Sequence, residues 1–297
     1  MSRAAMRSTA IATLALAILS APAFAQGLVY PLDVAVGDAK TIYLVDRQLP
    51  GVWKSTDGVL SPLFKAGKKF RTRLNAVRCI ASDGKGALLV GDTGMREVFR
   101  LTADGKLTPL TNPKTGELVE DGKKKFTVLG QIGIPMGIAV DKAGMIHVAD
   151  LELQRIWQVP AAGGEPKEFA VLPAPRGMTF GKDGRLWVVS GGPKNQLVTI
   201  TPDGKITPVV TDRVFRYPHD VALDDAGNAY VSDGYADCIW KIAPGGKPAK
   251  WVTDKQLDNP VGLDFQGPNL LVVDSRARQV FQVTPDGKLT VVSLKAK

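Results

Sequence analysis

Pro-Met-Gly-Ile-Ala-Val-Asp, at residues 135–141, is the clearest of six imperfect copies of one phrase that run along the chain. The other copies begin at Pro31, Asn75, Pro175, Pro218 and Pro260. After each copy come a turn, a second apolar run that ends in Asp (once in Ser), and a third run that usually contains Trp or Phe. A fixed period of this kind is typical of folds in which each unit packs only against its neighbours.

Asp-Gly and Gly-Gly pairs are a second recurring feature. A tight turn follows each third run, at Asp57-Gly58, Asp104-Gly105, Gly163-Gly164, Asp203-Gly204, Gly245-Gly246 and Asp286-Gly287. These pairs supply the positive φ that a two-residue hairpin needs, so they mark the reversal into a fourth strand. Four short strands in roughly 45 residues match a propeller blade. The sequence therefore predicts an all-β fold, a six-bladed β-propeller of four-stranded antiparallel blades, with an insertion at residues 112–132 after the second blade.

The N-terminus has the pattern of a secretory signal. Arg3 and Arg7 precede an apolar stretch at residues 11–19, and Ala-Phe-Ala at residues 23–25 is a small-x-small cleavage site. The apolar stretch is too short to span a bilayer. We expect cleavage near Ala25, a propeller over residues 26–297, a periplasmic or secreted location, and no membrane insertion.

Charge and cysteine content narrow the choice of partners. Thirty-eight Lys and Arg against 29 Asp and Glu give a formal net charge of +9, which favours anionic partners. The basic residues are scattered rather than clustered, so nucleic acid is a poor partner. The two cysteines, Cys79 and Cys238, fall in the second and fifth repeats, which lie opposite each other in a six-fold ring. We expect two unpaired, buried thiols, because a disulfide needs a far shorter separation.

The repeated phrase resembles the NHL repeat, most closely at residues 135–157 and 218–240, and the resemblance covers essentially all of residues 26–297. It implies a six-bladed propeller, a shape shared by enzymes, sensors and binding scaffolds. Within the repeat, the Asp that ends each second run is expected to bond backbone amides of the following loop. His147 lies inside a second run and is expected to pack between blades.

The variable loops should share one face of the propeller. Strands in a blade alternate in direction, so the loops that lead into the blades lie with the second-to-third loops. Arginine gathers in these loops, Arg176 and Arg216 among them, whereas lysine follows the tight turns on the other face. A planar guanidinium suits a carboxylate or a phosphate. We predict anion recognition on this face, with an ordinary solvated surface as the alternative.

The position after each opening proline should lie nearest the central channel. Aligning the six copies places Leu32, Ala76, Met136, Arg176, His219 and Val261 there. Asp33 and Asp220 follow two of these positions where other copies have glycine. The pair His219 and Asp220 could ligate a metal or perform acid–base chemistry; the alternative is that both residues simply pack there. Our ligand-binding candidates are Asp33, Met136, Arg176, Arg216, His219, Asp220 and Tyr235.

Two enzyme families resemble the chain more distantly. The gluconolactonase and regucalcin family implies a divalent metal held by a first-blade Glu with Asn and Asp, but Leu32-Asp33 offers no Glu, and Met136 and Arg176 stand where Asn is wanted. Residues 218–223 and 230–235 resemble peptide α-amidating lyases, a family that implies zinc held by three histidines. The chain contains only two histidines, so that zinc site cannot be built.

We therefore predict an exported, monomeric binding scaffold. Its partner is an anionic small molecule, a polysaccharide or a protein, bound by the arginine-bearing face. The alternative is a hydrolase or lyase of the gluconolactonase or amidating-lyase kind, with a site at the channel mouth around His219. Its catalytic residues are unknown, with His219 and Asp220 as candidates. No cofactor is established, and His219, Asp220 and Asp33 leave room for a single divalent metal.

Overall fold

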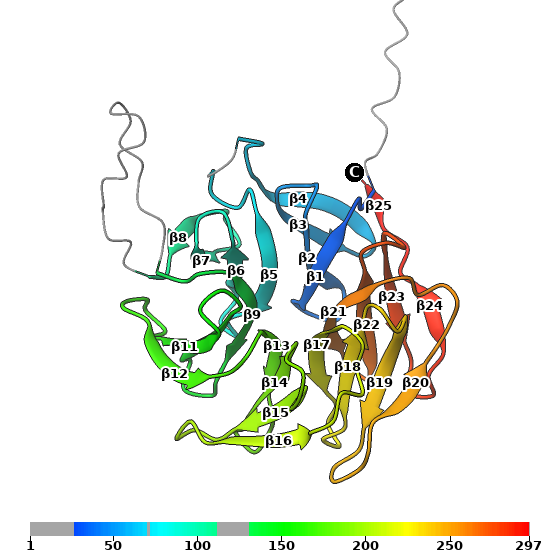
Figure 1. Cartoon of the computed structure of the whole chain (residues 1–297). Helices are drawn as coiled ribbons and strands as arrows, with labels where there is room; N and C mark the ends of the chain where they lie inside the picture. The colour runs from blue at the N-terminus through cyan, green and yellow to red at the C-terminus, as the bar shows by residue number, and fades with distance from the viewer. Residues whose placement is uncertain (1–26, 70–71, 112–130, 297) are drawn as a thin grey trace, which may run out of the picture.

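Six sheets stand as blades around a central axis (Figure 1), in a computed structural model that describes residues 27–69, 72–111 and 131–296. In every blade the strands follow one another outward from the axis, and each pairs with the next in antiparallel register. No helix occurs among these residues, so none of them forms a helix that could cross a membrane. The predicted six-bladed propeller is confirmed. The expected signal and residues 112–130 of the insertion lie outside the described part of the chain.

Each blade supplies one strand to every ring of the propeller. The innermost strands are β1 (Pro31–Val36), β5 (Val77–Ser82), β9 (Pro135–Val140), β13 (Pro175–Phe180), β17 (Pro218–Leu223) and β21 (Pro260–Gln266). The second strands are β2 (Thr41–Asp46), β6 (Leu88–Asp92), β10 (Ile146–Asp150), β14 (Leu186–Ser190), β18 (Ala229–Asp233) and β22 (Asn269–Asp274). The third are β3 (Gly51–Thr56), β7 (Glu97–Leu101), β11 (Arg155–Val159), β15 (Leu197–Ile200), β19 (Cys238–Ile242) and β23 (Gln279–Val283). The outer strands are β4 (Val59–Lys65), β8 (Leu107–Pro109), β12 (Lys167–Val171), β16 (Ile206–Val210), β20 (Ala249–Val252) and β24 (Leu289–Val291).

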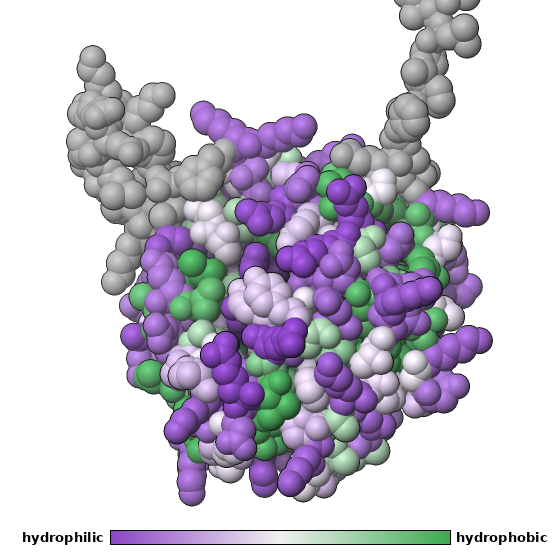
Figure 2. Space-filling model, turned by 45° about the vertical axis from the view of Figure 1, so that its right-hand side comes forward, coloured by the Kyte–Doolittle hydropathy of each residue, from purple (hydrophilic) through white to green (hydrophobic). Residues whose placement is uncertain are grey.

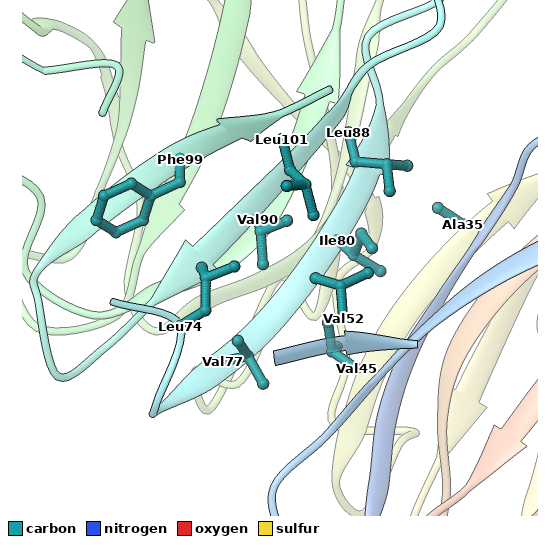
Figure 3. Packing of buried hydrophobic residues seen from close by; sticks show 10 residues of the cluster. All are labelled: Ala35, Val45, Val52, Leu74, Val77, Ile80, Leu88, Val90, Phe99 and Leu101. Carbon is teal, nitrogen blue, oxygen red and sulfur yellow. The ribbon is translucent and has the colours of Figure 1, made fainter. Parts of the chain in front are cut away.

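Six hydrophobic clusters hold the ring together, one at each junction between neighbouring blades. Figure 3 shows the junction of the first two blades, where Val45 and Val52 face Ile80 and Val90. Burying one such side chain contributes roughly 1.5–3 kcal/mol. A single blade exposes both faces, so these junctions, rather than the blades themselves, carry the stability.

The Asp that ends five of the six second strands ties the loops to the blade. Asp150 accepts the amide N–H groups of Gly133 and Ile134 from the loop before β9, and those of Glu152 and Leu153 from the loop after β10. Its equivalents make the same kinds of bond in their own blades. The expected bonds to the following loop are confirmed, and each carboxylate also fixes the loop that leads into its blade.

Three further residues behave as expected from the sequence. Cys79 and Cys238 are buried and unpaired. His147 is 2% exposed, and its ring lies 4.8 Å from that of Phe169 and 5.0 Å from that of Phe180 in the next blade. It is therefore a packing residue between the third and fourth blades.

The C-terminal strand closes the ring from outside. β25 (Lys295–Ala296) runs parallel to β4, and the Lys295 amide donates to the Gly58 carbonyl at 2.8 Å. Closer to the axis, the Ser275 hydroxyl donates to the Pro31 carbonyl at 2.6 Å. These contacts join the first and sixth blades, and β25 lies beside β4 of the first blade (Figure 1).

Candidate functional site

The strand registers correct one residue at the channel mouth. Pro31 pairs with Asp46 and Pro135 with Asp150, whereas in the second blade Val77 pairs with Asp92. Val77, and not Asn75, is thus the equivalent of the opening proline. The predicted mouth residue Ala76 was wrong, and Arg78 takes that place. Counting back from the recurrent Asp, with the separation found in the first and third copies, would have found it.

The corrected mouth ring is half apolar and half polar. Leu32, Met136 and Val261 are apolar, while Arg78, Arg176 and His219 come from the second, fourth and fifth blades. Beneath this ring lies a cavity of about 490 Å³, which the innermost strands line as far as Ser82, Val140 and Phe180 at their other ends. Its lining includes residues of the leading loops and the second-to-third loops, and Asp150 bonds amides of both kinds of loop, which confirms that these loops share one face.

Most of the predicted ligand-binding residues meet at this cavity. Asp33, Met136, His219, Asp220 and Tyr235 line it. Arg176 lies at its border, behind the lining residue Tyr217. Arg216 is exposed and stands outside the lining; its amide donates to Asp233. Three lining residues that sequence reasoning did not single out are Arg78, Tyr217 and Tyr30, and the position of Tyr217 depends on contacts from another blade.

Two guanidinium groups lie at the mouth without an acidic partner. Arg176 is 7% exposed, and its buried Nε and Nη1 atoms have no hydrogen-bond partner within the described structure. Its guanidinium carbon is 4.2 Å from the centre of the Tyr217 ring. Arg78 donates from Nε to the Met136 sulfur at 3.3 Å, and burial together with the charge of Arg176 lowers its pKa. No described carboxylate forms an ion pair with either arginine.

The imidazole of His219 is kept neutral by its surroundings. Burial, followed by the charges of Arg176 and Arg78, lowers its pKa to about 3. Its ring packs edge to face against Tyr217 at 4.9 Å. A base of so low a pKa accepts protons poorly near neutral pH. An anion bound at the mouth would offset the two positive charges and bring the pKa of His219 back up.

Asp33 and Asp220 clasp neighbouring blades. The Asp33 carboxylate accepts the amides of Val34 at 2.8 Å and of Ile80 in the next blade at 2.9 Å. Asp220 does the same with Val221 at 2.8 Å and Leu263 at 2.9 Å. Burial raises the pKa of Asp220 to about 7, and burial and the nearby Asp220 raise the pKa of Asp33 well above its usual range.

The mouth residues do not fit a divalent metal. Within the described residues, no group of three His, Cys, Asp or Glu side chains is placed to hold one. Asp33 and Asp220 direct their oxygens to backbone amides, and His219 is the only cavity-lining histidine among these residues. Two nearby guanidinium groups would also repel a cation. Neither the calcium-type nor the zinc-type arrangement of the resembling families can be assembled here.

Two tyrosines form a stacked pair on the fifth-blade wall of the cavity. The rings of Tyr217 and Tyr235 lie 4.5 Å apart and 18° from parallel. Tyr235 is 54% exposed, whereas Tyr217 also contacts Arg176 and His219. The first-blade side of the mouth carries a looser pair, with Arg47 5.9 Å from the centre of the Tyr30 ring. Tyrosine and arginine therefore dominate the polar surface of the mouth.

Fold and repeat together define the class: the chain is a six-bladed β-propeller that carries an NHL repeat. Residues 215–242, which include His219, Asp220 and Tyr235, match the NHL repeat family. Among curated proteins the chain is similar to peptidyl-glycine alpha-amidating monooxygenase B of Xenopus laevis, with 30% identity over 129 residues. That match spans 39% of this chain and only 15% of the relative.

Solved structures share the fold at low identity. A catalytically inactive variant of virginiamycin B lyase from Staphylococcus aureus, with quinupristin, is 17% identical and has a TM-score of 0.65 over 89% of this chain and 84% of that one. A gluconolactonase from Xanthomonas campestris is 16% identical, with a TM-score of 0.68 over 89% and 87%. At these identities the likeness establishes the fold alone, so the function has to be argued from the site.

Proposed function

We propose that this protein binds a small organic anion at the mouth of its channel, with Arg78 as the direct partner and Arg176 as a second positive charge. One observation carries the proposal: two largely buried guanidinium groups lie at one cavity, and no described acid pairs with them. Burying an unpaired charge costs several kcal/mol. A bound carboxylate or phosphate would supply the missing partner through charge-assisted hydrogen bonds.

The shape of the site favours a small molecule over a polysaccharide or a protein. The cavity of about 490 Å³ has the size of a ligand pocket. Arg78 lines this cavity and Arg176 is 7% exposed at its border, so a flat protein surface would not reach either of them. The face of the molecule seen in Figure 2 is largely hydrophilic, and its apolar residues form separate groups. The proposal includes export of the protein, because residues 1–25 have the pattern of a cleaved signal. It also includes a monomeric state.

Calorimetric titration tests the anion site directly. The full chain is titrated with acetate, citrate and inorganic phosphate, beside Arg78→Met and Arg176→Met variants. Arg216→Met is the matched control, since that arginine lies on the same face outside the cavity. We expect both site variants to weaken binding at least fivefold, Arg78→Met more strongly, and the control to bind as the unaltered protein does. Equal binding by all four proteins would refute the proposal.

A second candidate is hydrolysis or elimination at the same mouth. It is supported by the similarity to the amidating monooxygenase and by Asp220, whose pKa of about 7 would let it exchange a proton at neutral pH beside the cavity. Elemental analysis without chelators, on the protein and on a His219→Ala variant, tests the metal-dependent form of this candidate. One stoichiometric metal that the variant loses would favour the enzyme. Without a metal in either protein, a metal-dependent enzyme is excluded.

A further inference from the structure

The glycine at position 234 leaves a notch in the cavity wall on the side of the fifth blade. A Cβ atom at this position would lie 2.2 Å from Oδ1 of Asn259 and 2.8 Å from Nε2 of His219. Both of these residues line the cavity. The backbone of Gly234 does not have the positive φ that would itself require glycine. Glycine is needed here because the two polar side chains approach so closely.

Backbone hydrogen bonds hold the two edges of the notch in place. The Gly234 amide donates to the Tyr217 carbonyl at 3.0 Å. The Asn259 amide donates to the Asp274 carboxylate at 3.0 Å, and the Asn259 carbonyl accepts from the Ser275 amide at 3.1 Å. The backbone of Asn259 is therefore fully bonded, and only its side chain is left to bind another group.

The side chains at the notch lack hydrogen-bond partners. Asn259 is 6% exposed, and its side-chain amide bonds to no other described residue. The ring of His219 packs against that of Tyr217 at 4.9 Å, and within the described structure neither of its nitrogen atoms is hydrogen-bonded. Buried polar groups of a folded protein are normally bonded. Two unbonded groups side by side at a cavity indicate a partner from outside the chain.

The notch favours a neutral group that donates a hydrogen bond. Oδ1 of Asn259 can only accept, so it repels a carboxylate oxygen. Burial and the charges of Arg176 and Arg78 keep the imidazole of His219 neutral by lowering its pKa, so that Nε2 can donate or accept. The same two positive charges repel an ammonium group.

A hydroxyl group meets these conditions with a single atom. Because both side-chain atoms approach the same Cβ position, they lie within about 5 Å of each other, and one oxygen atom between them can reach both at hydrogen-bond distance. It would donate to Oδ1 of Asn259 and accept from Nε2 of His219. The nitrogen of a ligand amide could donate to Asn259 in the same way, but it could not accept from His219.

We propose that Asn259 and His219 hold a hydroxyl group of the ligand at the Gly234 notch, and that the ligand is a hydroxy acid. The inference rests on the proposed anion site and adds a neutral group to its ligand. Asn259 then selects for the hydroxyl, while the arginines select for the charge. Arg78 belongs to the second blade and the notch to the fifth, so the spacing between carboxylate and hydroxyl has to be varied in the experiment.

Hydroxy acids of increasing length test the notch. Glycolate, 3-hydroxypropionate, 4-hydroxybutyrate and 6-hydroxyhexanoate are each titrated calorimetrically into the full chain, beside the parent acid that lacks the hydroxyl. We expect at least one of them to bind roughly three- to tenfold more tightly than its parent. Asn259→Leu keeps the branched shape of the side chain and removes its hydrogen bonds, so it should reduce this ratio to about one. Asn269→Leu is the matched control, because Asn269 lies at the opposite end of β22 from Asp274, and it should keep the ratio.

Gly234→Ala tests the same notch from its other side and serves if Asn259→Leu does not fold. Its methyl group would occupy the space between Asn259 and His219, so it should also abolish the gain from the hydroxyl. Malonamate and succinamate, which carry an amide in place of the hydroxyl, test the kind of donor. If either gains as much over its parent acid as the best hydroxy acid does, the hydroxyl is the wrong group.

The outcomes separate this inference from the proposed function. If every hydroxy acid binds as its parent does, while Arg78→Met weakens all of them, the anion site stands and the hydroxyl site is wrong. If the gain from the hydroxyl persists in both Asn259→Leu and Gly234→Ala, the hydroxyl is bound elsewhere and the inference fails. If no acid binds the unaltered protein, both the inference and the proposed function fail.

Discussion

Replacing Arg176 with methionine should make the free protein more stable while it weakens anion binding. Arg176 is 7% exposed, and two of its nitrogen atoms have no partner among the described residues. A side chain that a fold keeps for its own stability normally has its buried polar atoms bonded. An arginine kept for a ligand remains unsatisfied until the ligand arrives, and its removal should then relieve the free protein.

The size of the gain follows from the contacts of that side chain. Each unsatisfied buried group costs about 1–3 kcal/mol, so the two nitrogen atoms together cost about 2–6 kcal/mol. Removing the guanidinium loses its contact with Tyr217, worth up to about 2 kcal/mol. A methionine sulfur beside the same ring recovers about 0.3–1.5 kcal/mol. With the full 2 kcal/mol lost, these terms leave a gain of roughly 0.3–5.5 kcal/mol, and we expect a net stabilisation of about 1–3 kcal/mol, within that range.

Thermal and urea unfolding of the free proteins measure this change. For a domain of this size, 1 kcal/mol corresponds to about 2–4 °C in Tm, so Arg176→Met should raise Tm by about 2–12 °C. Arg216→Met, the exposed control, should stay within about 0.5 kcal/mol of the unaltered protein. A decrease of about 1 kcal/mol or more in the free energy of unfolding of Arg176→Met would show that this arginine supports the fold. Arg78 alone would then remain as evidence for the anion site.

Three further predictions concern the clasps of the ring. Asp220 has a pKa of about 7 in the folded protein against a usual value of 3.8, so the free energy of unfolding should fall as pH rises between these values. Urea unfolding at several pH values should show that Asp220→Asn reduces this fall. The same dependence of the unfolding free energy on pH in both proteins would contradict this. Gly177→Ala should lose about 1–3 kcal/mol, because its Cβ would overlap the Asp220 carboxylate, whereas Gly27→Ala, with open space around it, should not; equal unfolding midpoints contradict this. Deleting residues 294–297 removes β25 and the half-buried Leu294, and should speed hydrogen exchange of β4 amides several-fold; unchanged protection of β4 would show that β25 does not clasp the ring.

The fold could be predicted because its signals are local. Asp-Gly turns, apolar runs and a recurrent Asp each act within one blade, and six copies average out the errors of any single copy. The bonds of Asp150 to its own two loops show how local the determinants are. Even the mistaken alignment of the second copy, at Asn75 rather than Val77, left the number of blades unchanged.

The site was harder to predict because its contacts join distant blades. Asp33 and Asp220 looked like candidate ligands, yet their partners are the amides of Ile80 and Leu263, far away along the chain. Arg78 was missed because one copy lacks the opening proline. Tyr217 has no distinctive sequence signal, since its role depends on Arg176 stacking on it from the fourth blade.

The residues that break the repeat fall into two physical kinds. Asp33 and Asp220 replace glycine, and each accepts a hydrogen bond from a backbone amide of the following blade. Hydrogen bonds within the fold therefore account for both residues. Arg78 and Arg176 replace apolar mouth residues, and no described acid forms an ion pair with either of them. Evidence for an anionic ligand therefore lies in a charge without a partner, rather than in unusual residues as such. On that criterion the carboxylates of the mouth belong to the architecture and its arginines to the ligand.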